Sequence, residues 1–157
     1  MNKILLGIAG LTAMFMASTA NATLIMRTTD GVVPVIEIED GDAGDLNGDA
    51  NAIATFFTSA LWNFTTESAF GDGALLFPGI LDLTLTGTSK GAGTLTVLLT
   101  ETGLSGFSSS VLTSGGNMGG SLDAKLWVDA GNGEFAKTTL LNTGSATAGN
   151  PYSFSTG

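Results

Sequence analysis

The densest group of side chains that could do chemistry is an acidic turn at residues 40–49, which reads D-G-D-A-G-D-L-N-G-D. The oxygen-bearing side chains of Asp45, Asn47 and Asp49 have the i, i+2, i+4 spacing of the first ligands in an EF-hand calcium loop. The rest of such a loop is missing, because Ala50 replaces the sharp-turn glycine and Phe56 replaces the closing carboxylate. A solvated turn between strands therefore competes with a calcium site. The candidate calcium ligands are Asp42, Asp45, Asn47 and Asp49.

A tryptophan is the second candidate. If Leu122, Leu126 and Val128 face a core, the alternation of their strand places Trp127 on the polar side. An exposed tryptophan can stack on a sugar ring, so Trp127 is a candidate carbohydrate-stacking residue. A loop or another molecule could also cover that side, and one tryptophan alone does not form a binding platform.

Composition removes most catalytic arrangements. The chain has no histidine and no cysteine, so it lacks the base of Ser-His-Asp and Cys-His enzymes and the usual ligands of zinc, copper and haem. Ser-x-x-Lys and the aspartic-protease signature Asp-Thr-Gly are also missing. Paired carboxylates could still hydrolyse a glycan, but the 14 acidic residues offer no preferred pair. We expect a non-enzymatic protein, with calcium as the one cofactor left open.

The first 22 residues have the layout of a bacterial secretory signal helix. Lys3 supplies the positive charge, residues 4–17 are largely apolar, and Ala20-Asn21-Ala22 places small residues where signal peptidase needs them. The apolar run is too short to span a bilayer as a helix. We expect cleavage after Ala22, no stable membrane span in the mature chain, and a secreted or cell-surface location in a Gram-negative bacterium.

The remaining residues, 23–157, suffice for one domain with its own core, and a single domain is expected. The formal net charge of the chain is −9, and it becomes one unit more negative if the signal with Lys3 is removed. Such a charge excludes nucleic acid and anionic lipid as partners, because both need a basic surface. Without cysteine, burial and β-ladders must stabilise the fold.

Strand patterns dominate residues 23–157. Leu81, Leu83 and Leu85 alternate with Asp82 and Thr84, which gives one apolar and one wet face. Half-buried strands of this kind are typical of antiparallel sheets, two of which can close over a shared core. We therefore predict an all-β fold, an antiparallel β-sandwich of jelly-roll or immunoglobulin-like type. The predicted strands are 23–29, 32–39, 52–58, 61–66, 80–86, 94–100, 107–113, 121–128 and 137–141.

Three local features complete the prediction. Residues 51–60 could form a short helix or turn in place of a strand. Asn132-Gly133 suits a tight hairpin in which both residues take positive φ. Trp62 and Phe64 share one strand face and are expected to pack in the core.

Taken in order, these segments resemble the secreted domain of PEP-CTERM proteins, the exosortase-sorted exports of biofilm-forming Gram-negative bacteria. The resemblance implies a cell-surface or extracellular-matrix protein, with exopolysaccharide or other surface proteins as partners and signal peptidase acting during export. It also implies that the G-D-L-N turn belongs to this family's own pattern. A secreted carbohydrate-binding module, assisted by calcium, is the alternative. The similar stretches are residues 44–47, 60–66, 81–85, 93–103, 144–147 and 151–154.

The chain departs from the family at its end. Such proteins finish with a Pro-Glu-Pro motif, an apolar helix and a basic tail, whereas this sequence stops at Gly157 without them. The resemblance implies either truncation at the C-terminal edge of the domain or a released form. With truncation, a final strand is missing, a sheet edge stays open, and residues after Leu141 are expected to be poorly ordered.

Overall fold

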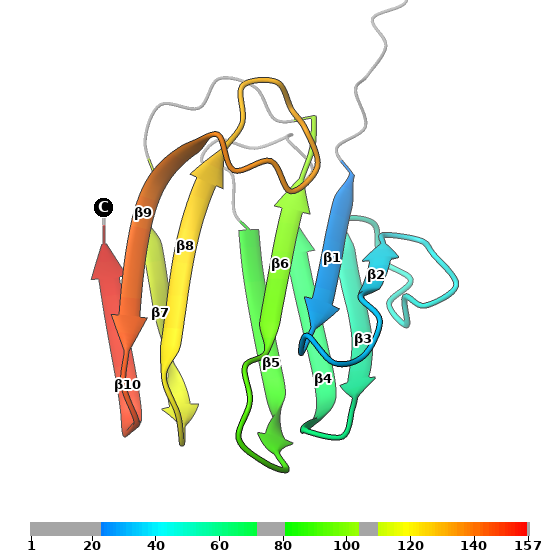
Figure 1. The fold of residues 1–157 in the computed structure, drawn as a ribbon. Coiled ribbons are helices and arrows are strands. Elements are labelled where there is room, and N and C mark those ends of the chain that lie inside the picture. The colour runs from blue at the N-terminus through cyan, green and yellow to red at the C-terminus, as the bar shows by residue number, and fades with distance from the viewer. Residues whose placement is uncertain (1–22, 72–80, 104–109, 157) are drawn as a thin grey trace, which may run out of the picture.

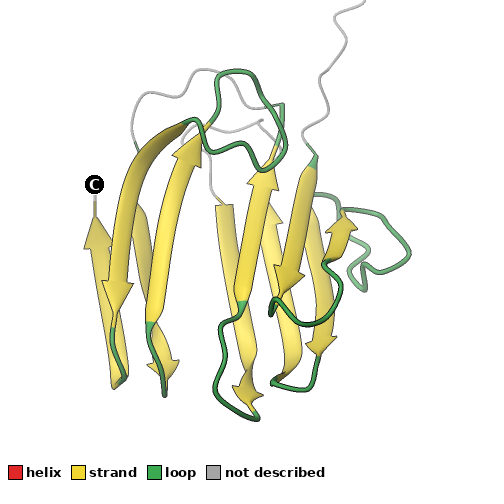
Figure 2. Cartoon of the chain, in the orientation of Figure 1, coloured by secondary structure: helices red, strands yellow, loops and turns green. Residues whose placement is uncertain are grey.

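The computed structural model describes residues 23–71, 81–103 and 110–156, and these ranges are all-β. Strands and loops fill them in Figure 2, and they contain no helix, so none that could cross a membrane. The predicted signal helix at 1–22 lies outside the described residues. The strands are β1 (Leu24–Thr29), β2 (Ile36–Glu39), β3 (Ala52–Thr58), β4 (Trp62–Gly71), β5 (Leu81–Ser89), β6 (Thr96–Glu101), β7 (Leu112–Met118), β8 (Leu122–Val128), β9 (Thr139–Ala146) and β10 (Gly149–Thr156).

These strands form four antiparallel sheets, with the orders β2-β1-β6, β3-β4-β5, β10-β7 and β8-β9. Figure 1 shows β9, β8, β6, β1 and β2 in a near layer and β10, β7, β5, β4 and β3 behind them. We call β1–β6 the N-terminal half and β7–β10 the C-terminal half. Each half therefore places one sheet in front of another.

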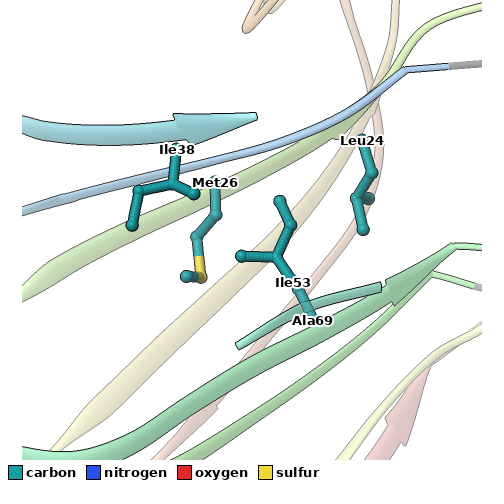
Figure 3. Packing of buried hydrophobic residues seen from close by; sticks show 5 residues of the cluster. All are labelled: Leu24, Met26, Ile38, Ile53 and Ala69. Atoms are coloured by element: carbon teal, nitrogen blue, oxygen red, sulfur yellow. The ribbon is translucent and has the colours of Figure 1, made fainter. Parts of the chain in front are cut away.

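The buried core lies between the two sheets of the N-terminal half. Leu24 and Met26 of β1 and Ile38 of β2 point toward Ile53 of β3 and Ala69 of β4, as Figure 3 shows. The register explains this set, because Met26 pairs with Ile38 and Ile53 pairs with Ala69, which keeps each pair on one face. Burying an aliphatic side chain of this size contributes about 1.5–3 kcal/mol before entropic costs.

Burial decreases toward the C-terminal half. Leu83 of β5 and Val97 and Leu99 of β6 pack against the core cluster but are only partly buried. In the C-terminal half, no residue whose burial the structure describes is fully buried. β8 alternates apolar and polar residues and is only half-buried on its apolar side, whereas β1 buries Leu24, Ile25 and Met26 in succession. The two halves therefore differ in sequence pattern as well as in packing.

The predicted strand 32–39 is too long at its start. Asp30 Oδ1 accepts the backbone amides of Val32 at 2.9 Å and Val33 at 3.0 Å, which fixes a turn. β2 therefore begins only at Ile36. The predicted strand 52–58 is confirmed as β3, so the helix alternative at 51–60 is wrong.

Two other predicted strands continue further than expected. The strand predicted at 61–66 extends to Gly71, and the one predicted at 80–86 extends to Ser89. β4 and β5 pair along this whole length, from Trp62 opposite Ser89 to Gly71 opposite Leu81. Pairing along this long ladder outweighs the low strand propensity of the polar and glycine residues near the strand ends.

The C-terminal half differs most from expectation. β7 lies about five residues beyond the strand predicted at 107–113, of which residues 107–109 are outside the described ranges. β9 continues past 141, and β10 pairs with β7, so the expected poor order after Leu141 is wrong. The Phe154 ring lies against the backbone of Gly144, where an added Cβ would come within 2.2 Å of the ring. Ring-on-glycine packing therefore anchors this end of the chain.

The tight hairpin predicted at Asn132-Gly133 is also wrong. β8 and β9 are antiparallel partners, but residues 129–138 form a longer loop between them. Asn132 has the expected positive φ of 56°. The Gly133 amide, however, donates to Asp129 Oδ2 at 2.8 Å, so the aspartate side chain shapes the loop.

Candidate binding site

An open cavity of about 2940 Å³ lies between the two halves. Two strands, β4 and β9, line the cavity with alternate residues, which means that one face of each strand is directed toward it. These residues are Trp62 and Phe64 of β4 and Thr139 and Leu141 of β9. β5, β6, β7 and β8 line it with runs of consecutive residues, as strands do when they present an edge. The cavity is therefore bounded by strand faces and by four strand edges.

Each of those four strands is an end strand of its sheet. One edge of each pairs with no other strand in the ranges that the structure describes. The floor beside the β5 edge is apolar, because Leu81, Leu83 and Leu85 share one face, with Leu81 40% and Leu85 38% exposed. Leucines exposed to this extent on one strand face leave apolar area for a ligand to cover.

The chain has two tryptophans, and both line the cavity. Trp62 packs on Phe64 with ring centroids 5.9 Å apart, and both residues are half-buried and outside the buried core cluster. The Trp62 Nε1 atom is buried and finds no hydrogen-bond partner in the described part of the chain. Assignment of these two rings to the core was therefore wrong, because they form part of the cavity wall.

Trp127 is half-buried and lies opposite Leu140 of β9, which is 45% exposed. A register shift occurs at this point, because Leu126 pairs with Asn142 and the next pair skips one residue of β9. Trp127 also lines the cavity. The predicted stacking role remains a prediction.

In the acidic turn, Asp45 is the organising residue. Its Oδ1 accepts the amides of Asn47 at 2.8 Å and Ala54 at 3.0 Å, and its Oδ2 accepts the amide of Gly41 at 3.1 Å. The Leu46 amide donates to the Ala54 carbonyl at 2.7 Å. The turn is thereby tied along the outer edge of β3.

Hydrogen bonds also engage two of the other candidate calcium ligands. Asn47 Oδ1 accepts the Asp49 amide at 2.9 Å, and Asp42 Oδ2 accepts the Glu39 amide at 3.2 Å. Within the described ranges, no three acidic side chains are arranged to hold a metal ion. A calcium ion at Asp42, Asp45, Asn47 and Asp49 would have to replace these contacts.

The titration of Asp45 follows from the same contacts. Partial burial raises the pKa of its carboxyl, but the amides of Ala54, Asn47 and Gly41 together outweigh burial and hold the pKa below its usual range. The pKa of Asp30 is also lowered, first by the nearby Ser59 hydroxyl and then by the Val33 and Val32 amides. Both carboxylates stabilise turns in their charged forms.

The loop at 129–138 connects the two halves beside the cavity. The Arg27 guanidinium of β1 lies 4.0 Å from the centroid of the Phe135 ring, and its Nε donates to Glu37 at 2.6 Å. Asn132 Oδ1 accepts the Gly103 amide at 2.8 Å. The predicted turn residue Asn132 thus contributes a contact between halves that its local sequence does not indicate.

Two arrangements in the described ranges could bind a ligand. The cavity offers apolar and aromatic surface with strand edges, while the acidic turn offers oxygens that are mostly engaged by backbone amides. The cavity is therefore the better candidate. The chain matches no known protein family, no curated protein and no solved structure.

Proposed function

We propose that the chain is a non-enzymatic exported protein of the cell surface or extracellular matrix of a Gram-negative, biofilm-forming bacterium. The observation that carries this proposal is the hydroxyl-rich outer face of β5, where Thr84, Thr86 and Thr88 are exposed and the opposite face is apolar. A surface of this kind presents many hydrogen-bonding groups without a reactive centre. The N-terminal pattern around Lys3 and Ala20-Asn21-Ala22 is the proposed signal for export.

The fold proposed for this role is an antiparallel β-sandwich of jelly-roll or immunoglobulin-like type. Face-to-face packing of Leu24 and Met26 against Ile53 supports it. The resemblance to the secreted domain of PEP-CTERM proteins supports the surface role. Exopolysaccharide or other surface proteins are the proposed partners, and the net charge of −9 disfavours nucleic acid.

Export and inactivity can be tested together. Expression of the full chain in a Gram-negative host is expected to give a periplasmic or extracellular product that begins at Thr23, by N-terminal sequencing. A variant with Ala20→Asp and Ala22→Asp should remain unprocessed, because aspartate does not fit the small-residue pockets of signal peptidase. A cytoplasmic, uncleaved wild type would contradict export. Hydrolysis of any glycan by the purified protein would contradict the non-enzymatic role.

A carbohydrate-binding module is the second candidate, favoured by the two tryptophans that line one cavity. Under this alternative, purified exopolysaccharide should quench tryptophan fluorescence, and the quench should be lost in Trp127→Ala. Trp62→Ala serves as the matched control for the other ring. An unchanged quench in Trp127→Ala would remove the stacking role of that residue.

Assistance by calcium has its own test, for which Asp49 is the best position. No hydrogen bond in the described part of the chain engages its carboxylate, so Asp49→Ala should leave the turn folded. Calorimetric titration with calcium should show binding that Asp49→Ala weakens and that Asp82→Ala, on the exposed face of β5, does not. Equal titrations of all three proteins would remove the calcium site.

A further inference from the structure

Strand directions around the cavity are the starting observation. Figure 1 shows β6 and β8 running the same way in the near layer, and β5 and β7 both running the opposite way in the far layer. In each layer, the two strands that face each other across the cavity are thus parallel to each other. They belong to different sheets, and no ladder joins them in the described ranges.

The directions of these edge strands restrict the direction of any strand that pairs with both of them. Every ladder in the described ranges is antiparallel. A single strand running opposite to β6 and β8 would be antiparallel to both, and the same holds for one strand between β5 and β7. Each layer therefore has the strand directions that an additional antiparallel strand needs at either edge.

Side chains define the chemistry of that strand. On one side of the cavity, Leu83 and Leu85 of β5 and Val97 and Leu99 of β6 are half-buried or exposed apolar residues. Because neighbouring residues of a strand point to opposite faces, an inserted strand needs an apolar side chain at every second position. The partner strand must therefore alternate between apolar and polar residues.

Charge restricts the partner further. Two lysines, Lys125 and Lys137, line the cavity, and the acidic residues there outnumber them. A second copy of this chain would bring a further net charge of −9, which opposes close approach. A neutral or basic strand is the complementary occupant. The acidic residues lining the cavity are Asp82, Glu101, Asp123 and Asp129.

We propose that the cavity between the two halves is an acceptor site for an extended strand of a partner polypeptide, neutral or basic and alternating in apolar residues. Pairing to the strand edges supplies affinity, and the leucine floor of β5 selects the side chains. This inference does not rest on the proposed surface function, because it uses only the strand edges and the walls of the cavity.

The test uses purified protein and a synthetic peptide of about nine residues, the length of β5, that alternates valine and threonine and carries lysine at both ends. Both tryptophans line the cavity, so binding should change their fluorescence. A twin peptide with glutamate ends should bind more weakly, and a version with a central proline should not bind, because proline cannot donate to a ladder. Equal binding of all three peptides overturns the proposal.

Two variants on β5 form a matched pair. Leu85→Asn makes the apolar floor polar, whereas Thr86→Asn changes a neighbouring residue on the opposite face of the same strand that does not line the cavity. We expect Leu85→Asn to weaken peptide binding about tenfold or more and Thr86→Asn to leave it unchanged. Unchanged binding by a folded Leu85→Asn overturns the proposal.

Hydrogen exchange of the wild type gives a measurement that does not depend on the folding of a variant. The lysine-ended peptide should slow amide exchange in β5 and β7, in β6 and β8, or in all four strands. Binding without slower exchange at any of these edges overturns the proposal. So does slow exchange at these edges in a dimer formed without peptide, because a second copy would then be the occupant. Slower amide exchange at these edges with exopolysaccharide, but not with peptide, also overturns the proposal.

Discussion

The two halves of the molecule use apolar residues in different ways. In the N-terminal half, Leu24 and Ile53 are fully buried because two sheets face each other and their side chains form one cluster. In the C-terminal half, the apolar residues Leu126 and Val128 of β8 remain half-buried. Alternation makes a strand amphipathic, whereas burial needs a second layer whose side chains fill the space.

Glycine accounts for much of this difference. β7 contains Gly115 and Gly116, and β9 contains Gly144, so the sheets of the C-terminal half offer few side chains to one another. The Phe154 ring of β10 lies against Gly144 of the facing sheet, whereas the Tyr152 ring lies against Gly116 within its own sheet. A half built in this way has strand ladders but little apolar volume.

The largest expected effect is a cavity in the packed half. Ile53→Ala should lower the free energy of unfolding by about 2–5 kcal/mol, because a fully buried isoleucine loses its contacts. Leu126→Ala in β8 is the matched control and should cost about 1 kcal/mol or less, since that side chain is already half-exposed. Urea denaturation measures both. Equal losses would remove the distinction between the halves.

The next effect tests ring packing in the C-terminal half. Gly144→Ala should destabilise the protein by roughly 1–3 kcal/mol, because the new Cβ would overlap the Phe154 ring. Adding Phe154→Ala should remove most of that extra cost, which a double-mutant cycle by thermal unfolding would reveal. Gly120→Ala, where a Cβ meets nothing within 4 Å, is the control. Additive losses in the double mutant would show that the ring is not the cause.

A smaller effect concerns the acidic turn of the N-terminal half. Asp45→Ala should cost on the order of 1–2 kcal/mol near neutral pH, because three backbone amides lose their acceptor. The pKa of Asp45 is lowered in the folded protein, so its stabilisation is full above the unfolded pKa of about 3.9 and is lost as pH falls through the folded value. Urea midpoints measured from neutral pH down to about pH 3 should therefore converge for wild type and variant. Asp82→Ala, on the exposed face of β5, is the control for removal of a carboxylate at neutral pH.

The smallest effect is at the contact between halves. Phe135→Leu removes the ring that lies over Arg27 and should cost about 0.5–1 kcal/mol. Amide exchange should accelerate in the loop at 129–138 and remain unchanged in β3. Arg27→Lys keeps a cation at this position and should have a weaker effect. Faster exchange in β3 would mean that the contact stabilises the whole N-terminal half.

Local pattern predicted most of the N-terminal half. The strand at 52–58 agrees in its bounds, because its alternation leads directly to the buried positions Ile53 and Phe57. β10 is not among the predicted strands, although Tyr152 and Phe154 alternate in the sequence. Its partner β7 contains adjacent glycines and shows no apolar stripe, so nothing local indicated the pairing.

In the candidate sites, too, local sequence pattern predicted one part and missed another. Local spacing identified the acidic turn, but not that the amides of Gly41 and Ala54 already engage Asp45, since Ala54 lies nine residues further along the chain. The cavity was beyond local pattern altogether. It depends on which strand edges pair and which do not, and that is set by contacts between distant segments. For the same reason Trp62 was assigned to the core.

The position of the acidic turn affects how copies of the protein could meet. An outer strand normally exposes backbone groups that can recruit an identical chain and start fibril growth. At Ala54 both the amide and the carbonyl are taken by the turn, through Asp45 and Leu46. The turn also surrounds that margin with carboxylates, which repel a like-charged neighbour. Edge-to-edge pairing with another molecule is thus hindered at Ala54 of β3, and concentrated solutions should resist aggregation through this edge.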